Sequence, residues 1–335
     1  MSKSKRSVTI IDVARAANVS VSTVSRVINN KDDVSEATFR RVNDVIAELG
    51  YAQSLAARSM RSHRTDVIGM LLPDIDDPFS VEVMRGVNRA IIEASYDLLI
   101  YTNGEIRKNN SANWERKYVA LLNSNVTDGV IIVTPMADQF ASASPVVSID
   151  PNRNSPSGPA VLSTNFHGAK EATEYLIKLG HRRIGYIGGR KDLLSAVRRQ
   201  GGYEEALKEA GISPIPELMM PGDYTADTGY EQATVLLSLD EPPTAIFAAN
   251  DQSALGVLRA AEALDVRVPD DLSVVGYDNI PDASYLGLTT VDQHIRQMGY
   301  VGTQMLFTLI RGQELDSPTY KVASELIIRG SCKPN

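Results

Sequence analysis

The chain has 335 residues, of which 43% are hydrophobic, and its formal net charge is −7. This length exceeds one typical domain, so we expect two or three globular units with sizeable cores. The single cysteine, Cys332, excludes an intramolecular disulfide framework, and no apolar run reaches the roughly 18 residues of a membrane-spanning helix. The opening MSKSKRS is not followed by the apolar stretch that a signal peptide requires, so we expect a cytoplasmic protein.

Positive charge is concentrated at the start of the chain. Residues 1–64 hold 11 lysines and arginines against 6 acids, whereas the remainder holds 23 against 35. This asymmetry favours a basic, nucleic-acid-binding head joined to an acidic body with another task. The alternative is a basic segment that is simply solvated.

Two short helices are predicted in VTIIDVARAANVSVSTVSRVINN, residues 8–30. Thr9 can accept a hydrogen bond from the first-turn amides of a helix over residues 10–17, and Asn18 tolerates the left-handed conformation that ends it. Ser20 then caps a second helix that reaches Asn29. The side chains expected to pack these helices together are Val13, Ala14, Val19, Val24 and Val27.

The outward face of the second helix is small and polar and carries one guanidinium; it comprises Val21, Ser22, Ser25 and Arg26. In a DNA major groove, a guanidinium pairs bidentately with guanine, and small side chains let the helix backbone come close. The pattern therefore predicts a helix-turn-helix contact with DNA. Plain helix packing is the alternative, because two-helix hairpins are common in soluble proteins.

A third helix is predicted in VSEATFRRVNDVIAELGY, with Ser35 as its cap and Gly50 as its stop. Its expected apolar face is formed by Phe39, Val42, Val45, Ile46 and Leu49. Residues 52–65 are alanine-rich and basic and lack a core-sized apolar face. They form either a linker that becomes helical when something holds it or a flexible tether.

From residue 66 onward, buried apolar runs alternate with helical patterns, as in VIGMLL, DGVIIV, RIGYI, TAIFA and SVVGY. Such alternation predicts parallel sheets. About ten strand-like runs are too many for one ordinary doubly wound sheet, and PNRNSPSGP, residues 151–159, marks the expected break between two lobes. Ligands bind beyond the carboxyl ends of such strands, which here carry Asp74, Asp150, Asn250 and Asp278.

The motifs TIIDVARAANVSVSTVSRVIN, LGY, AARSMR, LGHRRIGYIGG, AANDQSALGVLRA and SVVGYDNIP together resemble the LacI/GalR family of bacterial transcriptional repressors. The resemblance follows nearly the whole chain in order. It implies a small all-α helix-turn-helix head, a hinge helix that folds on operator DNA, and an α/β core of two doubly wound lobes similar to periplasmic sugar-binding proteins. It also implies a homodimer on a near-palindromic operator.

The family's organisation sets the expected domain boundaries. The head covers residues 1–51, the hinge 52–65, and the effector-binding and dimerisation core 66–335. Within the core, lobe 1 is expected to comprise about residues 66–163 and 293–322, and lobe 2 about 164–292 and 323–335. No heptad run follows the closing RGSCKPN, so we expect a dimer and not a tetramer.

By motif position, Val21, Ser22 and Arg26 would face base edges. Ala57 would approach the minor groove, and Met60 stands where the family usually wedges a leucine between base pairs. Methionine is apolar but more flexible, so the sharpness of the DNA kink is open. Residues placed for phosphates or for packing are Thr9, Thr23, Ser25, Asn29, Ser35 and Thr38.

The resemblance also implies an effector site, formed by Asp74, Phe79, Ser80, Asp150, Arg199, Tyr224, Asn250, Asp278 and Gln293. Acids and amides accept hydrogen bonds from hydroxyls, and an aromatic face covers the C–H side of a sugar ring. The set therefore favours a sugar over a purine. At three positions a structural role is the alternative: Phe79 in the core, Asp150 as a loop cap and Gln293 within the fold.

Other conspicuous side chains have simpler interpretations. His63 and His181 lack partners at metal-ligand spacing, so we expect surface positions for them and no metal or other cofactor. Trp114 is expected to pack a helix and not to serve as a ligand platform.

The function expected from these features is operator-bound repression that a sugar relieves. Co-repression, activation and a non-sugar effector are the alternatives within transcription. A secreted sugar-binding protein would lack the basic head, and an enzyme would need a nucleophile or an acid/base pair that no motif here supplies.

Overall fold

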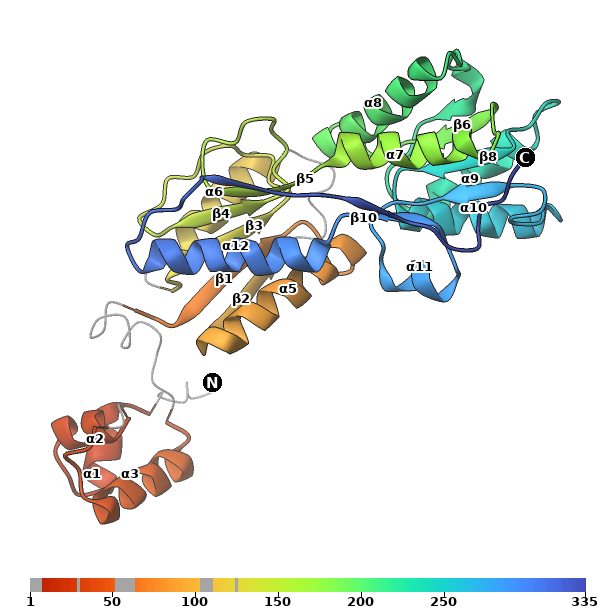
Figure 1. Ribbon diagram of the computed structural model, residues 1–335. Helices are drawn as coiled ribbons and strands as arrows, with labels where there is room; N and C mark the ends of the chain where they lie inside the picture. The colour runs from red at the N-terminus through yellow and green to blue at the C-terminus, as the bar shows by residue number, and fades with distance from the viewer. Residues whose placement is uncertain (1–7, 29–30, 52–63, 103–110, 124–125) are drawn as a thin grey trace, which may run out of the picture. The chain divides into compact units, whose positions relative to one another are not determined.

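The computed structural model describes residues 8–28, 31–51, 64–102, 111–123 and 126–335. It contains two compact units, residues 1–65 and 66–335, and each is described here by itself (Figure 1). None of the helices in the described ranges is long and apolar enough to span a membrane. The fold class expected from the sequence, an all-α head and an α/β core, is confirmed.

The described residues of the head form three helices, α1 (Ile10–Ala16), α2 (Val21–Ile28) and α3 (Glu36–Leu49). Thr9 and Asp12 form a reciprocal capping box at the start of α1, which stabilises its otherwise unpaired amides. Asn18 adopts a left-handed conformation with φ of 50°, and Gly50 ends α3 with φ of 60°. The predicted helix starts and stops of the head are therefore confirmed at these positions.

The small core of the head is made of short aliphatic side chains, and Val13, Val24 and Val42 are fully buried in it. Val19 packs at its edge. Because valine side chains are short, the three helices can approach closely, and the remaining faces stay free for solvent or a ligand.

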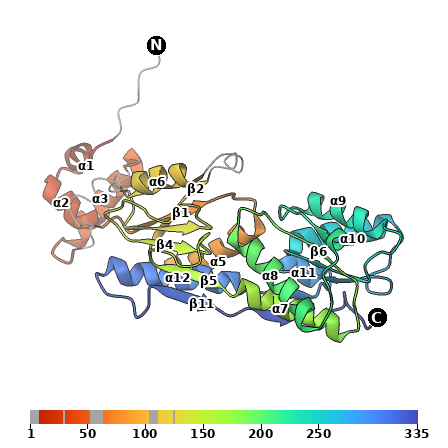
Figure 2. The same ribbon diagram turned by 90° about the horizontal axis from the view of Figure 1, so that it is seen from above.

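The first sheet of the core is six-stranded and entirely parallel, in the order β11-β5-β4-β3-β1-β2. Its strands are β1 (Val67–Leu72), β2 (Asp97–Thr102), β3 (Gly129–Val133), β4 (Val146–Ile149), β5 (Ala160–Ser163) and β11 (Thr319–Val322). Helices α5 (Pro78–Ala94) and α12 (Ile295–Ile310) cover one face, and α6 (Ser111–Leu122) covers the other (Figure 2).

Side chains alternate between the two faces along each strand, so the apolar core of lobe 1 is divided between the two faces of the sheet. Met70 and Ile131 pack toward α5 and α12, whereas Leu71 and Ile132 pack toward α6. Both faces are covered by helices, so β1 and β3 are apolar and buried throughout, as in a buried parallel sheet. The helices α5 and α12 touch so closely at Gly86 that an added Cβ would lie 1.9 Å from the carbonyl oxygen of Arg296.

The second sheet is four-stranded and parallel, in the order β7-β6-β8-β9. Its strands are β6 (Ile184–Ile187), β7 (Met219–Met220), β8 (Ala245–Ala248) and β9 (Ser273–Val275). Helices α7 (Asn165–Lys178) and α8 (Leu194–Glu209) lie on one face; α9 (Ala226–Leu237) and α10 (Asp251–Ala263) lie on the other (Figure 1). The short helices η2 (Pro216–Leu218) and α11 (Pro281–Tyr285) complete this lobe.

The chain passes between the sheets three times: after β5, after β10 (Thr290–Asp292), and between β11 and β12 (Glu325–Ile327). The strands β10 and β12 pair with each other in antiparallel fashion. Residues 151–159 do not form the predicted break, because they connect β4 to β5 within one sheet. The proline and glycine residues of that loop led to the wrong prediction, because they mark turns within a lobe as well as breaks between lobes.

Candidate functional site

The outward face of α2 matches the predicted small polar surface. Val21, Ser22 and Arg26 are exposed, and Ser25 is half-buried. Arg26 Nη1 lies 2.8 Å from Asp33 Oδ2, and both side chains are more than half exposed. An exposed ion pair of this kind is weak, so the guanidinium can exchange its partner for another acceptor at little cost.

The hydroxyl groups around α2 and at the helix starts are engaged within the head. Ser20 Oγ lies 2.7 Å from Ser22 Oγ and 2.8 Å from Thr23 Oγ1. Ser35 donates to Thr38 Oγ1 and accepts from the Thr38 amide. The remaining DNA-contact predictions, Asn29, Ala57 and Met60, lie outside the described residues.

A cavity of about 480 Å³ opens between the two lobes of the core, beyond the carboxyl ends of their strands. Strands β1, β4, β8 and β9 each deliver a polar residue to its wall from the loop or helix that follows. The cavity brings together seven of the nine predicted effector residues: Asp74, Phe79, Asp150, Arg199, Tyr224, Asn250 and Asp278.

Arg199 lies at the wall of this cavity with only 4% of its surface exposed. Its Nε donates to Asn165 Oδ1 at 2.8 Å, and its Nη1 donates to the carbonyl of Ala249 and lies 3.2 Å from Asp278 Oδ1. The guanidinium also stacks 3.7 Å from the centre of the Tyr277 ring. These contacts fix both the position and the charge of the cation.

The carboxylates near Arg199 are held in a poorly hydrated place. Burial raises the pKa of Asp278 to about 7, in spite of the opposing charge of Arg199 and a hydrogen bond from Gln293 Nε2 at 2.6 Å. Burial likewise raises the pKa of Asp150, which Arg199 partly opposes. A ligand hydroxyl that donates a hydrogen bond to the carboxylate of Asp278 or of Asp150 would favour the ionised form of that carboxylate.

Asn250 and Tyr224 form a second fixed group. Asn250 caps α10 by accepting from the Ser253 amide at 2.9 Å, and its Nδ2 donates to the carbonyl of Tyr224 at 3.0 Å. Tyr224 adopts a left-handed backbone with φ of 74°, and its hydroxyl lies 3.2 Å from Ser195 Oγ. The aromatic ring is thereby held in the cavity wall.

Two family models match the sequence: bacterial regulatory proteins of the lacI family over residues 9–54, and a periplasmic binding protein-like domain over residues 173–332. The HTH-type transcriptional repressor PurR of Vibrio atlanticus is 34% identical, with 97% of this chain and 98% of the relative covered. The ribose operon repressor of Halalkalibacterium halodurans is 36% identical, with 97% of each covered. The chain belongs to the lacI family of bacterial regulatory proteins.

Solved structures agree with this assignment. The lac repressor dimer bound to operator and the anti-inducer ONPF matches with a TM-score of 0.84 at 28% identity, covering 98% of this chain and all of that one. A complex of the transcriptional regulator CelR with cellobiose matches with a TM-score of 0.71 at 31% identity, covering 97% and 99%. A lacI-family member is a DNA-binding transcriptional regulator and not an enzyme, which confirms the predicted class of protein.

Two residues predicted for the effector site lie behind the cavity wall of this lacI-family core. Ser80 is fully buried in α5, where its hydroxyl donates to Asp77 at 2.9 Å. Gln293 is also fully buried, and its Nε2 donates to Asp278 at 2.6 Å. Neither residue is among those that line the cavity. Phe79 lines the cavity and packs against the lobe 1 core at the same time.

The expected packing of Trp114 against its own helix is confirmed. Trp114 packs against Tyr118, with ring centres 4.9 Å apart, but it also lines the cavity. The following residue, Glu115, is buried and accepts hydrogen bonds from the amides of Met136 and Ala137. Sequence reasoning missed several further lining residues, which include Asp76, Asp77, Arg190, Ser195, Asp223 and Gln252.

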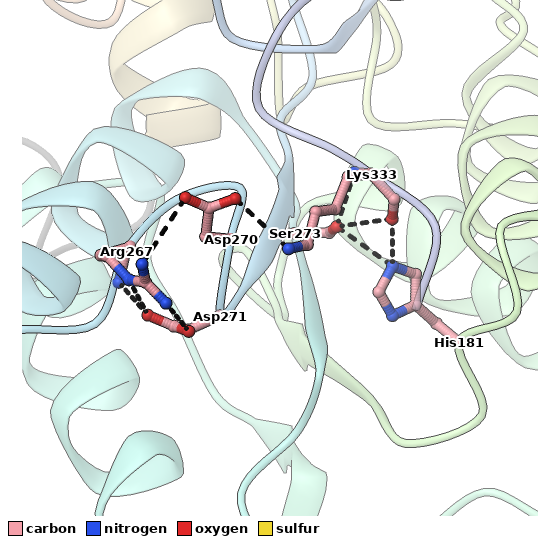
Figure 3. Close-up of polar contacts among 6 residues, drawn as sticks. All are labelled: His181, Arg267, Asp270, Asp271, Ser273 and Lys333. Carbon is pink, nitrogen blue, oxygen red and sulfur yellow. Dashed lines mark hydrogen bonds and ion pairs between the residues drawn. The ribbon is translucent and has the colours of Figure 1, made fainter.

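The expected surface position of His181 is wrong, because the residue is buried. Its Nε2 lies 3.2 Å from the carbonyl oxygen of Lys333 and 3.0 Å from Ser273 Oγ, so it ties the end of the chain to lobe 2 (Figure 3). Burial lowers the pKa of His181. Among the described residues there is no group of His, Cys, Asp and Glu that could hold a metal ion.

Proposed function

We propose that the protein represses transcription as a homodimer on a near-palindromic operator and is released when a sugar binds in the interlobe cavity. The observation that carries the effector assignment is the composition of the cavity wall. Among the described residues, seven acids line it: Asp74, Asp76, Asp77, Glu115, Asp150, Asp223 and Asp278. Ionised carboxylates only accept hydrogen bonds, and sugar hydroxyls offer many donors.

Both arginines that line the cavity in the described part of the chain are already paired with acids. Arg190 binds Asp192 through two hydrogen bonds, of 3.1 and 2.6 Å, and Arg199 is paired with Asp278. A phosphorylated sugar or a nucleotide would bring negative charge to a wall that is acidic already. The charge balance therefore supports an effector without a phosphate.

The aromatic residues in the wall support a ring-shaped ligand. Phe79 and Trp114 line the cavity from lobe 1, and Tyr224 lines it from lobe 2. An aromatic face can cover the apolar C–H side of a sugar. The names of the relatives include a ribose operon repressor and a cellobiose complex as well as PurR, so a purine is the competing effector class.

The DNA half of the proposal rests on α2. One short helix contacts too few base pairs for useful specificity, so two heads must act on half-sites about one helical turn apart. The lac repressor match is itself a dimer on operator DNA. The basic head predicts strongly salt-dependent binding.

A thermal-shift screen tests the effector class. Neutral mono- and disaccharides, sugar phosphates and nucleobases are each added to the full-length protein, and the melting temperature is followed. We expect stabilisation by at least one neutral sugar, because a ligand that binds only the folded state raises its stability. Stabilisation by a purine or a sugar phosphate alone would show that the sugar assignment is wrong.

A further inference from the structure

The side chain of Asn152 crosses from the lobe 1 loop between β4 and β5 to the chain before α8. Its Nδ2 donates to the carbonyl of Asp192 at 2.7 Å, and its Oδ1 accepts from the amide of Leu194. On its own side the residue is anchored, because its backbone amide donates to the carbonyl of Pro135 at 3.1 Å. The side-chain amide of Asn152 thus forms hydrogen bonds with two backbone positions of the other lobe.

This contact lies at the start of α8, where the helix lacks a side-chain cap from its own residues. The residue at the N-cap position is Leu193, whose side chain cannot accept a hydrogen bond, and no side-chain cap is formed. The first amides of a helix have no partner within the helix and require one from outside. Asn152 supplies that partner to Leu194, the first residue of α8, from the opposite lobe.

The connected segments carry the effector cavity. Asp150 lies two residues before Asn152 and lines the cavity from lobe 1. Leu193, Ser195 and Arg199 line it from the first turns of α8 or just before them. Asn152 is absent from the cavity wall, so a bound ligand would not need to touch it.

We infer that Asn152 is a positioning residue that latches α8 of lobe 2 to the β4–β5 loop of lobe 1 and so sets effector affinity without contacting the effector. This inference rests on the proposed effector site. Opening of the cleft by separation of these segments breaks both hydrogen bonds and uncaps α8. Loss of the latch therefore favours the open cleft, and the effector must then close it at the expense of its own binding free energy.

The matched control is Asn154→Ala. Asn154 lies in the same loop and also crosses between the lobes, where its Oδ1 accepts from Arg198 Nη2 at 2.8 Å. That contact is exposed and reaches a flexible side chain, not a helix amide. The same substitution two residues away thus removes an interlobe contact but leaves α8 capped.

The test uses the full-length protein and two readouts. Hydrogen exchange of the 190–199 segment, measured without any ligand, reports the cap of α8. Calorimetric titration with the neutral sugar found in the thermal-shift screen reports effector affinity. We expect Asn152→Ala to speed exchange in that segment, but not in α10, and to weaken the sugar by about 3- to 30-fold, the size of a lost helix cap. Asn154→Ala should change affinity by less than about twofold.

Asn152→Asp separates the cap from the rest of the contact. Its carboxylate still accepts from the Leu194 amide but cannot donate to the carbonyl of Asp192, so exchange should stay close to that of the unaltered protein. If Asn152→Ala leaves hydrogen exchange or sugar affinity unchanged, or if Asn154→Ala has the same effects as Asn152→Ala, the inferred positioning role of Asn152 is wrong. If no sugar binds the unaltered protein, the proposed function fails, while the exchange experiment still decides whether Asn152 caps α8.

Discussion

Arg199 Nη1 lies 3.2 Å from Asp278 Oδ1, and the two side chains expose only 4% and 9% of their surface. Arg199 comes from α8 and Asp278 from the loop after β9, so the pair joins two elements at the cavity wall. A buried charge pair gives little net stability compared with an apolar pair, but removal of one partner leaves an uncompensated charge. The pair is therefore a sensitive point of the core.

Replacement of Arg199 by methionine should destabilise the protein by about 3–5 kcal/mol, because Asp278 and Asp150 lose the guanidinium between them. The double variant Arg199→Met with Asp278→Asn removes both charges and should recover part of that loss. Urea denaturation at pH 7 measures both. A double variant that is as unstable as the sum of the two single variants would contradict the pairing.

The raised pKa of Asp278 gives stability a defined pH dependence. With a folded pKa of about 7, the folded protein keeps a proton that the unfolded chain releases near its ordinary value of about 4, so stability falls as pH rises between those values. Asp278→Asn lacks this titration. We expect the free energy of unfolding of the unaltered protein, relative to Asp278→Asn, to fall by up to about 1.4 kcal/mol per pH unit between pH 5 and 7. A pH-independent difference would show that Asp278 titrates normally.

His181 should produce the opposite slope. Its pKa is lowered in the folded protein, so below about pH 6.5 the unfolded chain takes up a proton that the folded protein refuses, and stability is lost as pH falls. His181→Gln can still hydrogen-bond but does not titrate. Relative to this variant, the unaltered protein should become less stable between pH 7 and pH 5 in urea denaturation. An unchanged difference across that range would place the histidine in contact with water.

Arg26 is expected to read a base in the operator. Arg26→Ala should weaken operator binding by about 1–3 kcal/mol and relax the preference at one base pair of each half-site. Arg40→Ala removes the same charge from α3, where Arg40 is paired with Glu36. This control should lower affinity for all sequences alike, if at all. Binding to a panel of single-base operator variants separates the two, and an unaltered base preference in Arg26→Ala would exclude it as a base reader.

Local signals in the sequence predicted the head almost completely. The capping box of Thr9, the left-handed Asn18 and the stop at Gly50 each depend on a few neighbouring residues, and a short segment of sequence contains all of them. The alternation of strands and helices likewise predicted two parallel sheets. The strand β5 was missed because its four residues follow a loop rich in proline and glycine.

Local patterns predicted the cavity wall only where a strand ends in a polar residue, as at Asp150 and Asp278. The positions of Phe79, Arg199 and Tyr224 were predicted through the family resemblance. The roles of His181 and Asn152 depend on partners 42 to 152 residues away, which no local pattern reveals. His181, for example, is buried because the end of the chain returns to cover it. Side chains whose partners come from another lobe or from the chain end require the three-dimensional structure.

The central claim, that a sugar in the cavity controls operator binding, is tested most directly by operator titration with and without that sugar. Fluorescence anisotropy follows a labelled operator selected by the unaltered protein, and Asp278→Ala serves as the variant with an impaired cavity. The account predicts that saturating sugar weakens operator binding of the unaltered protein by roughly 5- to 150-fold, the usual range of allosteric coupling. Asp278→Ala, assayed at a temperature where its melting curve shows it to be folded, should bind operator normally without sugar and fail to respond to it. If the stabilising sugar leaves operator affinity unchanged or tightens it, or if Asp278→Ala responds like the unaltered protein, the account is contradicted.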